Sequence, residues 1–185
     1  MTRSRSWLAP LLIVLAAAAV LLAIGRPPIC TCGRVTLWVS SSTSPETSQM
    51  LADWYSASHI VHGFLFFGLL WLVARRLPVA TRLLIAFLIE SGWEIAENSP
   101  IIINRYRSAT AAIGYSGDSV LNSVSDIVMM IAGFLLARRL PLWAAVAVVI
   151  LLELIPYSSS ATIWPSTSSC CSTPIDAIRT WQAGA

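Results

Sequence analysis

Histidine, carboxylate and amide side chains recur at helical spacing in three apolar segments of this sequence. His59 and His62 are three residues apart, so they share one face of a helix. Two further sets have spacings of three or four residues: Glu90, Glu94 and Glu97, then Asp118, Asn122 and Asp126. Imidazoles and carboxylates that meet in one place could act as general acid and base on a substrate, or could hold a metal ion.

The three segments are expected to bring these groups to a common depth in a membrane. Successive membrane helices run in opposite directions, and each residue advances about 1.5 Å along its helix. Six side chains then fall in the outer half of the bundle: His59, His62, Glu94, Glu97, Asp118 and Asn122. Glu90 and Asp126 lie deeper in the bundle interior. Because carboxylates that face lipid are costly, we expect all these groups to converge inside the bundle.

The predicted cluster has several possible roles, which the residues alone leave open. One is an outward-opening site for an envelope or lipid-linked substrate, in which a histidine is the acid or base and the carboxylates orient it. Arg105, Arg107 and Asn122 would then bind the substrate, the arginines by holding an anionic group. Another is a structural or accessory membrane subunit, whose cluster only holds short helices together by hydrogen bonds. Metal binding and proton or ion passage are further alternatives.

The motifs in the sequence point to no particular cofactor. No His-Glu-x-x-His zinc motif, Gly-x-Ser-x-Gly elbow or phosphate-binding loop is present. The leading expectation is therefore a site with neither a metal ion nor a cofactor. Whether the protein is an enzyme, and which protein partners it has, is not indicated.

The composition predicts that a lipid bilayer surrounds the elements that carry these residues. Hydrophobic residues make up 56% of the 185 residues and charged residues 11%, whereas a soluble domain has about 25% charged residues. This excludes a disordered tail and an ordinary soluble enzyme. Nucleic acid is excluded as a partner because the basic residues do not gather on one soluble face.

The predicted fold is all-α, a single membrane domain over residues 1–185 with five transmembrane helices and a possible sixth. The five apolar segments are about 7–24, 58–73, 81–97, 118–136 and 142–155, and the outside loops are 25–57 and 98–117. A cleaved signal peptide is the alternative for the first segment. Glycines in or beside these helices are expected to permit close helix contact: Gly63, Gly68, Gly92 and Gly133.

Arginine placement predicts the orientation in a bacterial inner membrane. All twelve basic residues are arginine, and most lie at the ends of apolar runs: Arg3, Arg5, Arg75, Arg76, Arg82, Arg138 and Arg139. Short loops rich in arginine face the cytoplasm. The sequence therefore predicts a multi-pass inner-membrane protein with a cytoplasmic N-terminus and a polar cluster near the outer face.

The sequence also contains two cysteine pairs and one serine-rich segment. Cys30 and Cys32 lie in the first outside loop, and a disulfide between them is not expected because the ring would be small and strained. Residues 157–173 are abruptly rich in serine and include Cys170 and Cys171. A shifted reading frame with permitted synonymous codons turns this segment into an apolar stretch. We hypothesise that two compensating single-base changes bracket it, which resequencing of the gene would test.

Three stretches resemble a family of uncharacterised inner-membrane proteins of Gram-negative bacteria. They are DWYSASHIVHGFLFFGLLWLVARRLP, LIESGWEIAENSPIIINRYR and GYSGDSVLNSVSDIVMMIAGFLLARRLP. The resemblance covers residues 26–155 and the tail from Pro174, and members look apolar where this chain has its serine-rich segment. It implies a multi-pass membrane location and no activity.

A more distant likeness is to VanZ-like membrane proteins, which are linked to glycopeptide resistance. It consists of an early helix that contains histidine and a later Ser-x-x-Asp helix before a glycine, here Ser123 to Asp126 and Gly133. Such an analogy concerns the fold, so no function follows from it.

Overall fold

The computed structural model describes residues 8–41, 44–109 and 115–160. Within these ranges the chain forms six helices and no strands: α1 (Leu8–Ala23), α2 (Ser56–Val73), α3 (Val79–Glu97), α4 (Pro100–Ala109), α5 (Val120–Arg139) and α6 (Leu142–Ser160). The all-helical prediction is thus confirmed for the described residues. Most of the serine-rich segment 157–173 lies outside them.

Two of these helices, α2 and α5, are long and apolar enough to cross a membrane. Shorter apolar stretches occur at Leu8–Ala23 and Leu142–Leu154. Length and composition alone also fit the buried helix of a soluble protein, so they do not establish five crossings.

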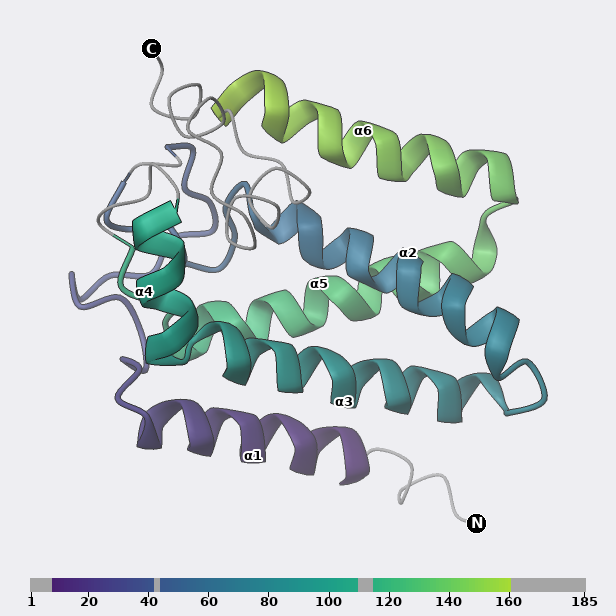
Figure 1. Ribbon diagram of the computed structural model, residues 1–185, viewed down its shortest axis with the longest axis horizontal. Helices are drawn as coiled ribbons and strands as arrows, with labels where there is room; N and C mark the ends of the chain where they lie inside the picture. Colours follow the sequence, from purple (N-terminus) through teal and green to yellow (C-terminus); the bar gives the residue numbers. More distant parts are fainter. Residues whose placement is uncertain (1–7, 42–43, 110–114, 161–185) are drawn as a thin grey trace.

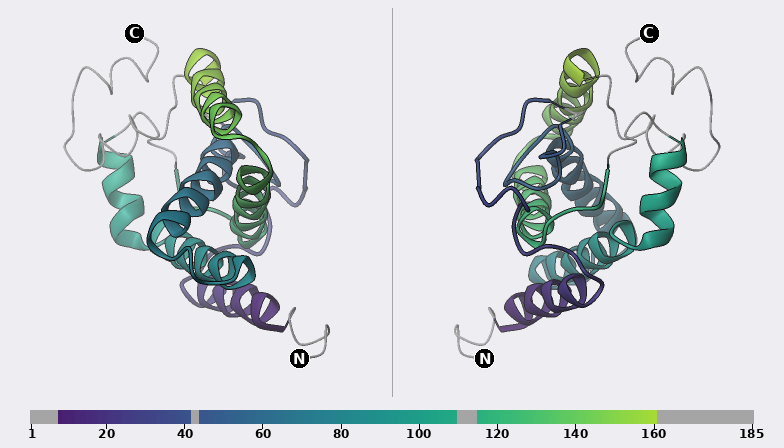
Figure 2. Two further views of the ribbon diagram at one scale, coloured as in Figure 1. Left: turned by 90° about the vertical axis from the view of Figure 1, so that its right-hand side faces the viewer. Right: turned by 90° about the vertical axis from the view of Figure 1, so that its left-hand side faces the viewer.

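Five helices run along the long axis of the molecule, and the short α4 lies at one end (Figure 1). The loop between α1 and α2 and the start of α5 are at this α4 end, whereas the α2–α3 and α5–α6 turns are at the opposite end. Seen along the long axis, α2 and α5 occupy the middle, with α1 and α3 to one side and α6 to the other (Figure 2). The segments that carry histidine and acid therefore share one end of the bundle.

Helix α4 lies within residues 98–117, for which the sequence predicts a loop. Pro100 is its first residue, where the missing backbone N–H costs nothing. The Ser99 hydroxyl accepts a hydrogen bond from the Ile102 amide at 3.4 Å, as an N-cap residue does. Ser99 followed by Pro100 is thus a helix-start signal in the sequence, and the prediction of a loop at this point was wrong.

Helices α2 and α5 pack backbone against backbone at two glycines. A Cβ added to Gly63 would overlap the Met130 carbonyl oxygen, and one added to Gly133 would overlap the Ile60 carbonyl oxygen. The expectation of close contact is correct for these two positions. It is wrong for Gly68 and Gly92, where a Cβ would meet no atom within 4 Å.

Gly63→Ala and Gly133→Ala are therefore expected to destabilise the protein, because backbone atoms cannot move aside as a flexible side chain can. We expect a loss of about 1–3 kcal/mol or more for each, in the range of overpacked cores. Thermal unfolding of the purified protein in detergent measures it. Gly68→Ala on the same helix is the matched control, and equal midpoints for Gly63→Ala and Gly68→Ala would refute the close contact.

The structure corrects the expectation for Cys30 and Cys32, which are joined by a disulfide. The Gly33 amide donates to the Cys30 carbonyl at 3.0 Å, and Gly33 has φ +76°. This turn sets the two cysteine Cα atoms 5.2 Å apart, within the range that disulfides span. The local turn thus supplies the geometry that spacing alone seemed to forbid.

A buried histidine and carboxylate cluster as candidate functional site

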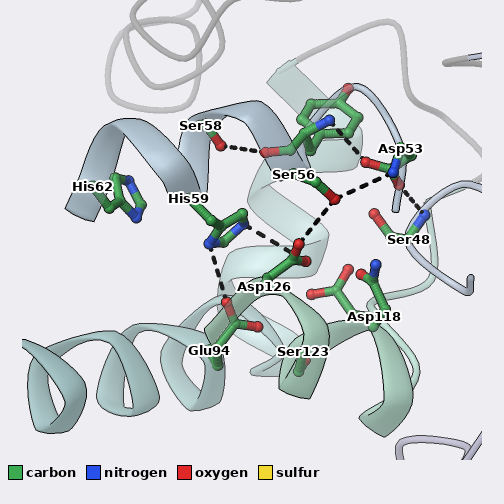
Figure 3. Close-up of polar contacts among 12 residues, drawn as sticks. Ser48, Asp53, Ser56, Ser58, His59, His62, Glu94, Asp118, Ser123 and Asp126 are labelled. Carbon is green, nitrogen blue, oxygen red and sulfur yellow. Dashed lines mark hydrogen bonds and ion pairs between the residues drawn. The ribbon is translucent and has the colours of Figure 1, made fainter. Parts of the chain in front are cut away.

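Helices α2, α3 and α5 bring a buried cluster of ionisable side chains together near the α4 end. His59 comes from the first turn of α2, Glu90 and Glu94 from the second half of α3, and Asp126 from the start of α5. Both glutamates have 0% of their surface exposed. Figure 3 shows His59 between Glu94 and Asp126. We call these four residues with His62 the His59 cluster.

His59 contacts carboxylates through both ring nitrogens. Its Nδ1 lies 2.7 Å from Glu90 Oε1 and 3.3 Å from Glu94 Oε1. Its Nε2 lies 3.8 Å from Asp126 Oδ2. Since the three acids come from two different helices, α3 and α5, His59 is the side chain that links them.

His62 shares Glu90 with His59. Its Nδ1 lies 3.2 Å from Glu90 Oε1 and 3.1 Å from Glu90 Oε2. The two imidazole rings meet edge to face, with centroids 5.3 Å apart, and the ring of Trp93 contacts His62 from α3. Glu90 is therefore a carboxylate with an imidazole nitrogen on each oxygen.

Glu94 differs from Glu90 because its carboxylate is fully buried and accepts no hydrogen bond from any described residue. Among the described residues, its ion-pair contact is with the His59 Nδ1 atom at 3.3 Å, and that atom lies closer to Glu90. A buried carboxylate without donors is costly, so its retention calls for a physical explanation.

Ser56 at the start of α2, with the loop residues before it, supports Asp126 from the loop side. The Ser56 hydroxyl lies 3.0 Å from Asp126 Oδ1, and it accepts a hydrogen bond from the Asp53 amide at 3.2 Å. Asp53 in turn accepts from the amides of Ser48 and Tyr55, at 2.6 and 2.8 Å. Burial raises the pKa of Asp53, and these two amide donors oppose the rise.

A second polar group joins the end of α3 to the start of α5. The Asn98 amide group donates to Asp118 Oδ2 at 2.7 Å, and Asn98 Oδ1 accepts from the Asp118 backbone amide at 2.6 Å. The Tyr115 hydroxyl donates to Asp118 Oδ1 at 2.8 Å. Both carboxylate oxygens of Asp118 thus have hydrogen-bond donors. Asn98 and Asp118 connect the end of α3 to the start of α5, and we call this hydrogen-bonded pair the Asn98–Asp118 joint.

Asn122 also has a structural position. Its side-chain amide donates to the Met50 carbonyl at 2.9 Å, and the neighbouring Ser119 hydroxyl donates to the Gln49 carbonyl at 3.0 Å. Ser119 also caps α5 by accepting from the Asn122 amide. These bonds hold the loop before α2 against the start of α5.

The remaining predicted site residues lie outside the His59 cluster. Glu97 is half-buried at the end of α3, and among the described contacts it makes no hydrogen bond or ion pair with either histidine. Arg105 and Arg107 are exposed on α4. Helical spacing thus groups Glu97 with Glu94, although Glu97 lies outside the cluster in the structure.

Sequence reasoning missed four residues of this region: Ser48, Asp53, Ser56 and Asn98. Three of them lie before or at the start of α2, where no periodic pattern marks them. Asn98 follows Glu94 by four residues, so the same spacing that selected the glutamates could have included it.

Asp118→Asn is expected to flatten the dependence of stability on pH. Burial raises the pKa of Asp118 above its ordinary 3.8. Its contribution is therefore fully present below pH 3.8 and is lost as the pH rises through the folded pKa. Thermal midpoints of both proteins in detergent should be similar at acidic pH, where Asp118 is neutral, and that of the wild type should fall below that of Asp118→Asn as the pH rises toward neutrality. Parallel curves would count against it.

Two overlapping groups in the cluster have their nitrogen and oxygen atoms close enough to hold a metal ion. One is His59, His62 and Glu90, and the other is His59, Glu94 and Asp126. In each group the ligand atoms lie within 4.8 Å of one another.

The described residues thus define an all-helical protein that buries histidine and acid and exposes apolar side chains. The chain belongs to the family described as protein of unknown function (DUF2585), which matches residues 21–184. It is 50% identical to a UPF0314 protein of Paracoccus denitrificans, over 98% of this chain and 94% of that protein. It is 47% identical to a UPF0314 protein of Sphingopyxis alaskensis, over 96% and 95%. No solved structure matches.

Proposed function

We propose that this chain is an integral inner-membrane protein whose His59 cluster acts as a proton-transfer site on an envelope or lipid-linked substrate. The observation that carries the proposal is His59 itself, a buried imidazole with a carboxylate at each ring nitrogen. Such an imidazole has the donor and acceptor groups that general acid–base catalysis uses.

Polarity that is inverted relative to a soluble protein supports the membrane location. Glutamate, asparagine and serine are fully buried, while large apolar side chains on several helices are mostly exposed: Leu72, Val73, Val128, Leu142 and Trp143. An apolar surface of this extent is expected to contact lipid. The two helices long enough to cross a membrane, α2 and α5, carry part of that surface.

Exposed arginines support the orientation. Arg75 and Arg76 follow α2, and Arg138 and Arg139 end α5, all exposed at the end of the bundle away from α4. The positive-inside rule places that end in the cytoplasm. The His59 cluster then lies toward the outer face of the inner membrane, and the start of α1 lies on the cytoplasmic side.

In the proposed site His59 exchanges the proton, and the acids fix its ring. Glu90 and Glu94 hold the Nδ1 side, and Asp126 with its Ser56 partner holds the Nε2 side. Arg105 and Arg107 lie on α4 at the same end of the bundle. Their guanidinium groups suit the anionic group of a lipid-linked substrate.

The test is complementation of a deletion strain, profiled for lipid and cell-wall composition. Glu94→Gln should fail to restore the profile while its membrane abundance equals that of the wild type, because the amide keeps the shape and removes only the charge. Glu46→Gln makes the same change in the loop before α2 and should restore the profile. The proposal would be contradicted by an unchanged lipid and cell-wall profile on deletion, or by full complementation by Glu94→Gln.

The second candidate is a structural or accessory subunit, and the Asn98–Asp118 joint favours it. Each of its carboxylate oxygens has a donor, as expected of groups that only hold helices together. In that case every neutral variant in the cluster should lose membrane abundance together with any phenotype.

A further inference from the structure

We propose that His59, His62, Glu90 and Glu94 bind a divalent first-row transition-metal ion between α2 and α3. This proposal rests on the proposed function, because it takes the same cluster as the functional site. The metal ligands would be the Nδ1 atoms of both histidines and one oxygen of each glutamate.

The distances fit such an ion. Ligand atoms around a metal at about 2.1 Å are about 3–3.5 Å from one another. His62 Nδ1 lies 3.1 Å from Glu90 Oε2, and His59 Nδ1 lies 3.3 Å from Glu94 Oε1. The 2.7 Å separation of His59 Nδ1 and Glu90 Oε1 has to widen, and Glu94, which meets His59 in a separate set without His62, has to move toward the ion. His59, His62 and Glu90 also meet as a set within 4.8 Å.

The Glu94 carboxylate is an independent observation that points to a cation. It is fully buried, beside His59, and neither oxygen accepts a hydrogen bond from the described residues. Buried charges in proteins are paired or coordinate metals. A divalent ion next to His59 Nδ1 would give the Glu94 carboxylate a second cationic partner, where no described residue donates a hydrogen bond to it.

Asp126 has the position of an outer carboxylate rather than a ligand. It faces His59 Nε2, whereas Glu90 and Glu94 face Nδ1. Histidines that bind a metal through one nitrogen commonly donate the other N–H to a carboxylate, which fixes the ring. The Ser56 hydroxyl, 3.0 Å from Asp126, holds that carboxylate in turn.

The donor set selects the class of metal. Two imidazole nitrogens and two carboxylate oxygens suit zinc, iron(II) or manganese(II), whereas magnesium and calcium prefer oxygen alone. An ion held by this set can polarise a substrate oxygen or activate a bound water. With His59 Nδ1 on the ion and its Nε2 N–H on Asp126, the bound water rather than the imidazole would exchange the proton with the substrate.

The test is the metal content of the full chain purified in detergent, followed by titration of chelator-treated protein with zinc and manganese salts. Wild type and Glu97→Gln should hold about one ion per chain. His62→Asn and Glu94→Gln should bind at least about tenfold more weakly, as should Asp126→Asn by loss of the outer carboxylate. Glu97→Gln is the matched control because it makes the same change on the same helix.

Several outcomes would overturn the site. A wild-type chain that neither retains nor binds an ion does so, as does equal binding by His62→Asn and Glu94→Gln, which identifies an adventitious ion only. If these variants do not accumulate, X-ray absorption on the metal-loaded wild type decides, since a shell without imidazole refutes the assignment. If the wild type binds metal and Glu94→Gln complements fully, the proposed function is overturned and the metal site is not. Failed complementation with no metal in the wild type overturns the metal site alone.

Discussion

His59→Leu is expected to prevent accumulation of the protein in the membrane. Among the described residues, His59 has ion-pair contacts with Glu90, Glu94 and Asp126, so the change removes a partner from each of these buried carboxylates. Breaking a buried ion pair by removing one partner costs about 3–5 kcal/mol. That loss is a large share of the stability of an ordinary protein, about 5–15 kcal/mol.

Quantitative immunoblotting of membranes from cells that express a tagged chain measures the effect. His62→Leu is the graded comparison, because among the cluster acids His62 has ion-pair contact with Glu90 alone. Adding Glu90→Gln to His59→Leu should restore part of the abundance, since one uncompensated charge is gone. Wild-type levels of His59→Leu would show that the three acids do not depend on this imidazole.

Asn98→Leu is expected to have the second largest effect, a loss of about 2–5 kcal/mol. Asn98 is fully buried and exchanges two hydrogen bonds with Asp118, besides donating to the Glu94 carbonyl at 3.0 Å. Leucine leaves the Asp118 amide and one carboxylate oxygen without these partners, and each buried unsatisfied group costs about 1–3 kcal/mol. The joint between α3 and α5 should open as a result.

Thermal unfolding in detergent, followed by loss of monodisperse protein, measures this destabilisation. Asn104→Leu is the matched control, because Asn104 is exposed on α4. The control should unfold close to the wild-type midpoint. Similar midpoints for the two leucine variants would mean that the Asn98–Asp118 joint contributes little to stability.

Helical spacing in the sequence was sufficient to anticipate that His59, Glu90, Glu94 and Asp126 come together. Each of these residues lies within a long periodic apolar segment, so its face is determined by the period of the helix. Because the polar side chains share one face of each helix and the other faces are apolar, the polar face is expected to point toward the bundle interior. The catalytic role assigned to the residues remains a prediction.

The contacts made by loops and helix ends could not be predicted in this way. Asp53 and Ser56 reach the cluster through turns at the start of α2, where backbone amides and not periodicity set the side-chain positions. Glu97 follows the spacing of Glu94 but lies where α3 ends. The Cys30–Cys32 disulfide likewise depends on one turn.

The glycine contact between α2 and α5 limits how any molecule could reach the interior. Gly63 lies one turn beyond His59, and Gly133 lies two turns beyond Asp126. Sliding of either helix along the other would drive backbone atoms together, so His59 and Asp126 keep a fixed separation. Any change that opens the interior must therefore leave α2 and α5 together at this contact.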